Sequence, residues 1–240
     1  MTDQEPPGGA GPWGAGPAPD QVPEAQPPAR ERMFNAPWPA LAVVAAIVVA
    51  YALQSSLAPG QEGVARWGFA PADLVRRPWP GLVTVMFVHA GWAHALINAM
   101  SALAFAPPVA RLMGPGWKGP MVFFLFYLAC GVVSTLGYTA MHLHSAEPVV
   151  GASGAIAGLM GGASRLLGPE ARPISPILSR PVISMGSGWV IVNALMAIFG
   201  GPFMDGARIA WEAHIAGFFA GVLLIGPFAW LAGWRRIARL

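Results

Sequence analysis

The sequence predicts an all-α membrane protein built as a bundle of six transmembrane helices. Hydrophobic residues make up 55% of the 240 residues and charged residues only 10%, whereas soluble domains carry about 25% charged residues. Six long stretches contain no Asp, Glu, Lys or Arg, and a helix needs about 20 apolar residues to cross the hydrocarbon core. We therefore expect six helices near residues 38–57, 91–112, 120–141, 153–167, 182–200 and 208–231.

The two ends of the chain differ from this apolar region. Residues 1–35 hold eight prolines interleaved with glycines and acids, which predicts a disordered tail. The tail lacks the basic start and apolar core of a cleavable signal peptide. Residues 36–233 are expected to form one domain without internal repeats, and residues 234–240 a basic tail. Because no organelle-targeting leader is seen, a bacterial plasma membrane is expected.

The basic residues predict how the helices are oriented. With the N-terminus inside, the inner segments hold ten of the fourteen Lys and Arg residues, and the outer segments hold Arg66, Arg76, Arg77 and Arg208. Both termini are therefore expected in the cytoplasm. The net charge is only +3 and the basic residues are scattered between apolar stretches, so no nucleic-acid partner is expected. The single cysteine, Cys130, excludes an intrachain disulfide.

The fourth apolar stretch has a glycine at every fourth position, at Gly154, Gly158 and Gly162. On a helix these residues form a face that lets a neighbouring backbone come close. Ser153 stands at the start of this helix, where free backbone N–H groups can stabilise an oxyanion. Fifteen residues at about 1.5 Å each span about 22 Å of a roughly 30 Å core, which predicts a water-filled cavity at Ser153. Taken alone, the stretch fits a packing seam with a capping serine equally well.

The sixth stretch contains an ionisable residue, His214, where ionisable groups are costly and usually functional. Gly217 and Gly221 form a second small-residue seam, and His214 shares a face with Gly217. If the two glycine seams pack together, His214 reaches Ser153 and can act as its general base. The alternative is a histidine satisfied by a backbone carbonyl. Glu212 is two residues away and faces elsewhere, so a dyad is expected rather than a Ser-His-Asp triad.

The second helix is expected to carry two further polar groups, His94 and Asn98, at a spacing of four residues. Both can donate hydrogen bonds to an oxyanion. Zinc ligation is the alternative, but no carboxylate lies in this stretch, so neither metal nor cofactor is expected. His89 is out of register with the pair and is expected to anchor a loop. His142 and His144 fall in an outer loop and are expected to be solvated.

Three motifs together resemble the rhomboid family of intramembrane serine proteases, over about residues 36–233. They are Gly151-Ala152-Ser153-Gly154, His94 and Asn98 after His89, and Ala213-His214 followed by Gly217 and Gly221. The first motif alone is weak, and the three in order are highly specific. The resemblance implies a six-helix bundle of rhomboid type whose short fourth helix starts at the active serine. It also implies cleavage of transmembrane protein substrates in or near their spans in the lipid bilayer, without a cofactor. The oligomeric state stays open.

Carried over residue by residue, the resemblance makes Ser153 the nucleophile and His214 the general base. It assigns the oxyanion hole to His94, Asn98 and the Ser153 backbone N–H.

The resemblance also implies where a substrate binds. It would lie as a strand beside residues 147–151, in contact with Val150 and Gly151. The loop 201–206 would cap the site with Met204 as a plug, and the fifth helix would be a lateral gate. The first outer loop, 58–88, would lie partly in the outer leaflet, consistent with its aromatic residues Trp67, Phe69 and Trp79.

Two positions depart from the family pattern. Members often carry an aromatic residue four after the serine, where it stacks on the histidine, and Ala157 stands there. The Trp-Arg pair common in the first outer loop is replaced by Trp79-Pro80.

Two other functions remain as alternatives. One is a catalytically weak or inactive rhomboid-like protein that binds membrane clients. The other is a small transporter or channel with a histidine proton relay, which the lack of repeats and of mid-membrane charges disfavours.

Overall fold

The structure, a computed structural model, describes residues 36–74, 78–168, 174–199 and 209–233, except for the side chains of Pro78 and Trp79. The two tails, the loop 201–206 and Met204 lie outside these ranges. Within them, regular structure is helical apart from one isolated antiparallel bridge between Phe69 and Val149. The α-helices are α1 (Trp38–Leu57), α2 (Gln61–Trp67), α3 (Pro78–Thr84), α4 (Trp92–Met113), α5 (Lys118–Met141), α6 (Ser153–Ser164), α7 (Arg180–Phe199) and α8 (Trp211–Ala232).

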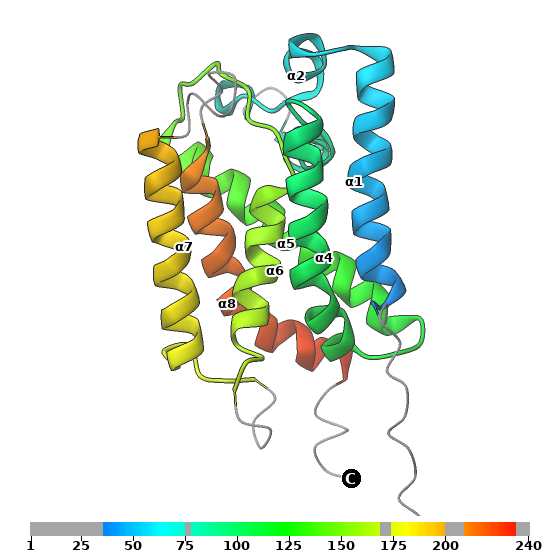
Figure 1. Ribbon diagram of the computed structural model, residues 1–240, viewed down its shortest axis with the longest axis vertical. Coiled ribbons are helices and arrows are strands. Elements are labelled where there is room, and N and C mark those ends of the chain that lie inside the picture. Colours follow the sequence, from blue (N-terminus) through cyan, green and yellow to red (C-terminus); the bar gives the residue numbers. More distant parts are fainter. Residues whose placement is uncertain (1–35, 75–77, 169–173, 200–208, 234–240) are drawn as a thin grey trace, which may run out of the picture. The chain divides into compact units, whose positions relative to one another are not determined.

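Five of the described helices are long and apolar enough to cross a membrane: α1, α4, α5, α7 and α8. They correspond to five of the six predicted helices, with ends within three residues of those expected. The remaining predicted helix is α6, which has 12 residues and is therefore about 18 Å long. The short helices α2 and α3 lie in the connection between α1 and α4 (Figure 1).

Helix α6 ends three residues earlier than the sequence predicts because Arg165 leaves the helix. Its backbone N–H bonds the carbonyl of Gly162, three residues back, which tightens the last turn. Its guanidinium donates to the carbonyl oxygens of Ser175 at 2.7 Å and Val222 at 2.9 Å. The cation therefore joins the end of α6 to α8 and to the following loop.

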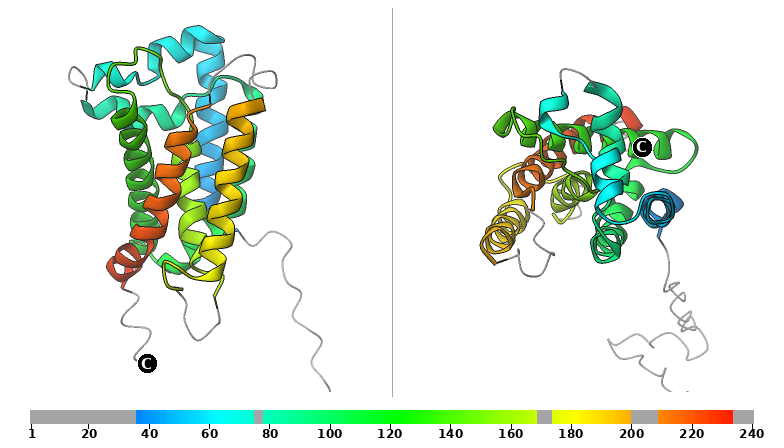
Figure 2. Two further views of the ribbon diagram at one scale, coloured as in Figure 1. Left: turned by 90° about the vertical axis from the view of Figure 1, so that its left-hand side faces the viewer. Right: turned by 90° about the horizontal axis from the view of Figure 1, so that it is seen from above.

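Helix α6 is the centre of the bundle. Every residue from Gly154 to Ser164 is buried, and α6 packs against α8, α5, α4 and α7. In Figure 1 it lies between α7 and α4 and is shorter than both, and Figure 2 shows it end-on among its neighbours. Its many glycines and alanines allow four helices to approach one short helix.

The predicted packing of the two glycine seams is confirmed. A methyl group added at Gly217 of α8 would overlap the carbonyl oxygen of Gly154, and one at Gly221 would overlap that of Gly158. The backbones of α6 and α8 are thus in direct contact, which only residues without a side chain permit.

The three glycines of the predicted α6 seam face α5 as well as α8. A methyl group added at Gly154, Gly158 or Gly162 would first meet the α5 side chains of Ser134, Cys130 and Phe126, respectively. Gly161, seven residues and therefore nearly two full turns after Gly154, is the α6 glycine whose added methyl would overlap α8 backbone, at Phe218.

The first outer loop differs from the prediction at Phe69. The structure buries this ring, which is 2% exposed and packs on Gly81 of α3, so Phe69 does not support the expectation that this loop lies partly in the outer leaflet. Its backbone N–H and carbonyl both pair with Val149, at 3.1 and 2.9 Å. Phe69 therefore fastens the loop to the segment that precedes Ser153.

Candidate functional site

The fold brings Ser153 and His214, which are 61 positions apart in the sequence, into contact. Ser153 is the first residue of α6, and His214 lies in the first turn of α8. The distance between Ser153 Oγ and His214 Nε2 is 2.8 Å, which is a hydrogen bond of ordinary length. The contact follows from the glycine seam, since Gly217 sits one turn below His214 and holds α8 against α6.

A third helix fixes the same point. Ser134 of α5 donates its hydroxyl to the carbonyl oxygen of Ala213 at 2.7 Å. A methyl group at Gly154 would overlap this hydroxyl. The residues directly after Ser153 and directly before His214 are therefore both in contact with Ser134, which the sequence analysis did not identify.

The other ring nitrogen of His214 has a partner that the sequence analysis also missed. Asn193 of α7 places Oδ1 2.7 Å from His214 Nδ1, and its Nδ2 donates to the carbonyl oxygen of Trp189 at 2.9 Å. Asn193 is 1% exposed. It is the one Asn, Gln, His or charged residue between positions 181 and 199, and that was the available signal.

An aromatic ring does lie against His214, although not from the position the family pattern suggests. Ala157 is buried and supplies no ring. The ring of Trp189 lies 5.7 Å from that of His214, tilted by 41°, and its Nε1 is 3.4 Å from the His214 carbonyl oxygen. Helix α7 thus contributes the aromatic neighbour that α6 lacks.

The predicted oxyanion-hole residues lie on the first turns of α4. His94 Nε2 is 2.8 Å from the place where a Cβ of Gly151 would be, and Ser153 Oγ is 3.6 Å from that place. Gly151 also has φ +117°, a region that side chains disfavour. The side chains of His94 and Ser153 therefore both border the space that a Gly151 side chain would fill. Asn98 is buried and donates Nδ2 to the His94 carbonyl oxygen at 3.1 Å.

His89 ties the preceding loop to α1, in keeping with the predicted anchoring role. Its backbone N–H and carbonyl bond the side-chain amide of Gln54 at 2.9 and 2.7 Å. The ring is fully buried beside Tyr51 and His94. Burial, with a smaller contribution from His94, lowers the pKa of His89 to about 3, so the ring is neutral at pH 7.

His142 is only partly solvated, with its side chain 33% exposed. Its Nε2 lies 3.0 Å from Glu212 Oε1, and its ring packs at 4.4 Å on Tyr138. Glu212 points away from His214, as the two-residue spacing predicts, and joins the start of α8 to the end of α5. His144 is exposed. Among the described residues, no group of three or more His, Cys, Asp or Glu could hold a metal ion.

The segment before Ser153 is extended and paired on one edge. Val149 pairs with Phe69, and the Gly151 N–H donates to the Val85 carbonyl at 3.0 Å. The backbone groups of Val150, between them, make no hydrogen bond to the described part of the chain. Because neighbouring residues of a strand direct their backbone groups to opposite edges, Val150 belongs to the unpaired edge.

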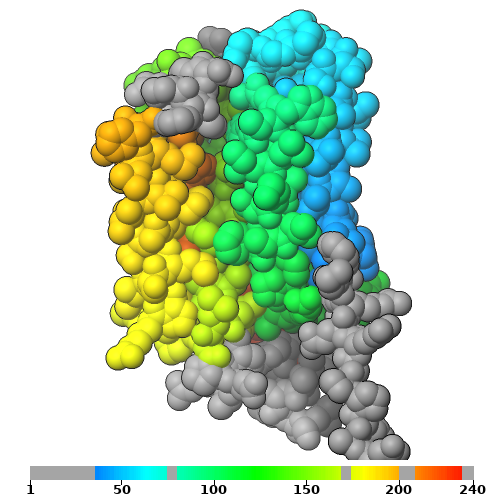
Figure 3. Space-filling model, in the orientation of Figure 1, coloured from blue at the N-terminus to red at the C-terminus, as the bar shows by residue number. Residues whose placement is uncertain are grey.

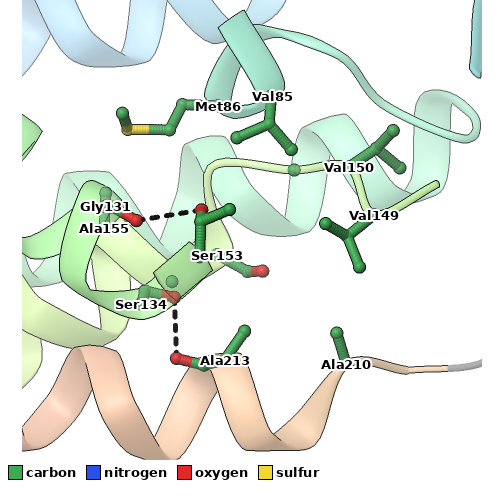
Figure 4. Close-up of a pocket in the computed structure, with 13 residues that line it drawn as sticks. Val85, Met86, Gly131, Ser134, Val149, Val150, Ser153, Ala155, Ala210 and Ala213 are labelled. Atoms are coloured by element: carbon green, nitrogen blue, oxygen red, sulfur yellow. Dashed lines mark hydrogen bonds between the residues drawn. The ribbon is translucent and has the colours of Figure 1, made fainter. Parts of the chain in front are cut away.

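A small cavity of about 30 Å³ adjoins Ser153 (Figure 4). Ser134 and Thr135 of α5 contribute polar groups to its wall, and Met86, Val150 and Gly131 contribute apolar surface. A cavity of this size and polarity can hold water. The sequence predicted a wet site at Ser153, and this cavity is the space next to it.

Comparison with known proteins gives one family. The Rhomboid domain family matches residues 76–230. The putative rhomboid protease YdcA of Bacillus subtilis (strain 168) is 38% identical over 87 residues, which cover 35% of this chain and 39% of YdcA.

Two other relatives match a similar share of the chain. The chloroplastic RHOMBOID-like protein 9 of Arabidopsis thaliana is 36% identical over 83 residues, 35% of this chain and 17% of that protein. The rhomboid protease GluP of Bacillus subtilis is 35% identical over 83 residues, 35% of this chain and 15% of GluP. The matched part is less than two fifths of each relative.

Proposed function

The chain belongs to the rhomboid family, and from that premise we propose that it is an intramembrane serine endopeptidase. It hydrolyses peptide bonds in or near the transmembrane segments of other membrane proteins. With five helices long and apolar enough to cross a bilayer, it is an integral, multi-pass membrane protein.

The observation that carries the proposal is the 2.8 Å contact between Ser153 Oγ and His214 Nε2. His214 accepts the hydroxyl proton as Oγ attacks the substrate carbonyl, and it returns that proton to the leaving amine as the C–N bond breaks. Water then hydrolyses the acyl ester and restores Ser153. The cavity beside Ser153 is large enough to hold this water.

Three donors are proposed for the oxyanion: the His94 ring, the Asn98 amide and the Ser153 backbone N–H. The Ala90 N–H lies 3.5 Å from His94 Nδ1. With Nδ1 accepting, the ring proton is on Nε2, beside Gly151. Asn98 uses one amide hydrogen on the His94 carbonyl and keeps the second for the oxyanion.

Substrate is proposed to add as a strand to the unpaired edge of residues 147–151, pairing with the backbone of Val150 and contacting Gly151 beside it. Two features support this: Phe69 already occupies the other edge at Val149, and the extended segment leads directly to Ser153. Met204, as a plug above the site, is part of the proposal and lies outside the described residues.

The membrane arrangement completes the proposal. Helix α6 is the fourth and shortest of six spans, and both termini, with the tails 1–35 and 234–240, are cytoplasmic. The positive-inside excess of the basic residues supports this orientation. Substrate enters beside α7, where Figure 3 shows a recess between α7 and α4 with α6 atoms at its floor.

The test is labelling with a fluorophosphonate probe, together with cleavage of a single-span substrate in liposomes. Ser153→Ala and His214→Ala are expected to abolish both. Ser56→Ala and His144→Ala are matched controls, since both side chains are exposed and neither belongs to the proposed site, and they should react like the wild type. Folded wild-type protein that neither reacts nor cleaves would instead support an inactive rhomboid-like protein that binds membrane clients.

A further inference from the structure

Asn193 is unusual on its helix because it is buried. Of the described side chains of α7, only Val182 and Asn193 are buried, and most of the others are exposed apolar groups. Val182 is a hydrophobic residue in a small apolar cluster. A buried amide, in contrast, is costly unless its polar atoms are hydrogen-bonded. Asn193 turns toward α8 and finds both of its partners there and on its own helix.

The two hydrogen bonds of Asn193 fix which atom faces His214. Its Nδ2 donates to the carbonyl oxygen of Trp189 at 2.9 Å. The reverse orientation of the amide would set Oδ1 against that carbonyl oxygen, which is repulsive. The group that faces His214 Nδ1 is therefore the amide oxygen, at 2.7 Å.

An amide oxygen only accepts hydrogen bonds, so the ring proton of neutral His214 must be on Nδ1. The lone pair is then on Nε2, the nitrogen 2.8 Å from Ser153 Oγ. This is the tautomer that a general base needs, because Nε2 must accept the serine proton. The hydrogen bond between Nδ1 and Asn193 Oδ1 also fixes the orientation of the His214 ring.

We propose that Asn193 is the positioning residue of the general base: its side-chain oxygen accepts the Nδ1 proton of His214 and so directs the unprotonated Nε2 to Ser153. The inference rests on the proposed protease function and deepens it. Asn193 does not touch the substrate or the reacting atoms, and it acts through His214. Its amide also stabilises the imidazolium that forms when His214 takes the proton.

The first test compares Asn193→Leu with Asn193→Asp. Leucine keeps the volume and loses the acceptor, whereas aspartate keeps an acceptor oxygen beside Nδ1. We expect Asn193→Leu to lower kcat about 10- to 100-fold, part of the about 10²–10⁴-fold that a positioned base contributes, with little change in KM. Asn193→Asp should retain more activity than Asn193→Leu. A purely structural amide predicts the reverse order, because leucine suits an apolar helix and a buried carboxylate does not.

The control is Leu53→Ala, which changes an exposed residue of α1, away from the α7 side where substrate is proposed to enter, and should leave kcat unchanged. If Asn193→Leu cleaves as fast as this control, the inference is overturned while the protease function stands.

The second test does not depend on activity or on the folding of the aspartate variant. The chain has five histidines, so ¹⁵N NMR of histidine-labelled protein in detergent gives five rings, and His214→Ala identifies the relevant one. We expect Nδ1–H and an unprotonated Nε2 in the wild type, and a loss of this preference in Asn193→Leu. An Nε2–H ring in the wild type would overturn the inference. The expected tautomer in a protein that never cleaves would leave the hydrogen bond in place and remove the protease function.

Discussion

Helices α6 and α7 are neighbours that hold their functional groups in opposite ways. Helix α6 is buried from Gly154 to Ser164 on all sides. Helix α7 is exposed along most of its length. Only 11% of the residues in its most apolar 18-residue stretch are buried, against 44% in the corresponding stretch of α4. Ser153 comes from the first helix, and the two groups that hold the side chain and backbone of His214, Asn193 and Trp189, come from the second.

The difference separates the position of the proposed nucleophile, Ser153, from the orientation of its proposed base, His214. The position of Ser153 is set by backbone contacts between α6 and α8, which cannot shift without breaking the core. The orientation of the His214 ring depends on hydrogen bonds to a helix with few packing contacts. Changes in α6 should therefore act on stability and activity together, and changes on α7 mainly on activity.

The largest effect among these predictions is expected at Asn98 of α4, whose side chain is buried. We assign its second amide hydrogen to the oxyanion. Asn98→Ala should lower kcat by about 10²–10³ with KM little changed, because the oxyanion exists only along the reaction. Steady-state cleavage in liposomes measures both constants. Unchanged turnover would remove Asn98 from the site.

The second-largest effect is expected from a substitution that disrupts the contact between α6 and α8. In Gly217→Ala the added methyl meets the Gly154 carbonyl oxygen, so the helices must separate and Ser153 and His214 move apart. A displacement of about 1 Å can cost about 10² in rate, and overpacking costs about 1–3 kcal/mol in stability. Activity and thermal unfolding should therefore both fall.

The matched control is Gly188→Ala on α7, where an added methyl meets nothing within 4 Å. Alanine is favoured over glycine in a helix interior by up to about 1 kcal/mol, so this variant should be as stable as the wild type or more so. Equal loss in the two variants would mean that the seam has no special role.

On the α7 side, Trp189 should matter less than the groups above. Trp189→Leu removes the ring beside His214 and the indole N–H near its carbonyl, and we expect kcat to fall about tenfold, equivalent to about 1.4 kcal/mol. Trp189→Phe keeps a ring, so its kcat should lie between those of the wild type and of Trp189→Leu. Thermal unfolding should change little, and the exposed Trp117, replaced by Phe, serves as the control. A large loss of stability in Trp189→Leu would contradict the separation drawn between α6 and α7.

The contacts of α6 were predictable from the sequence because they follow from helical spacing. Glycines four residues apart define a face, and Gly217 defines another that carries His214, so packing the two seams leads to the observed contact. The pattern did not say that the same glycines also face α5, at Ser134, Cys130 and Phe126.

The contacts of α7 were not predictable in the same way. Asn193 is the one side-chain amide in an apolar span, and the sequence does not say which neighbour its side of the helix meets. The search for an aromatic partner of His214 looked four residues after Ser153, whereas the structure supplies Trp189 from another helix. The burial of Phe69 was missed for a related reason, since its pairing with Val149 joins residues 80 positions apart.

The smallest effect is expected where α5 meets α8 at the surface, at the pair His142 and Glu212. The side chains are 33% and 11% exposed and lie 3.0 Å apart, and such partly exposed pairs contribute about 0–1 kcal/mol. Glu212→Gln keeps the shape and a hydrogen-bonding oxygen, so stability should fall by less than about 1 kcal/mol and less still at high salt. Because Glu212 points away from His214, kcat should stay unchanged. A large fall in kcat with an intact fold would show that the carboxylate acts on His214 after all, and the base would then have a charged partner in addition to Asn193.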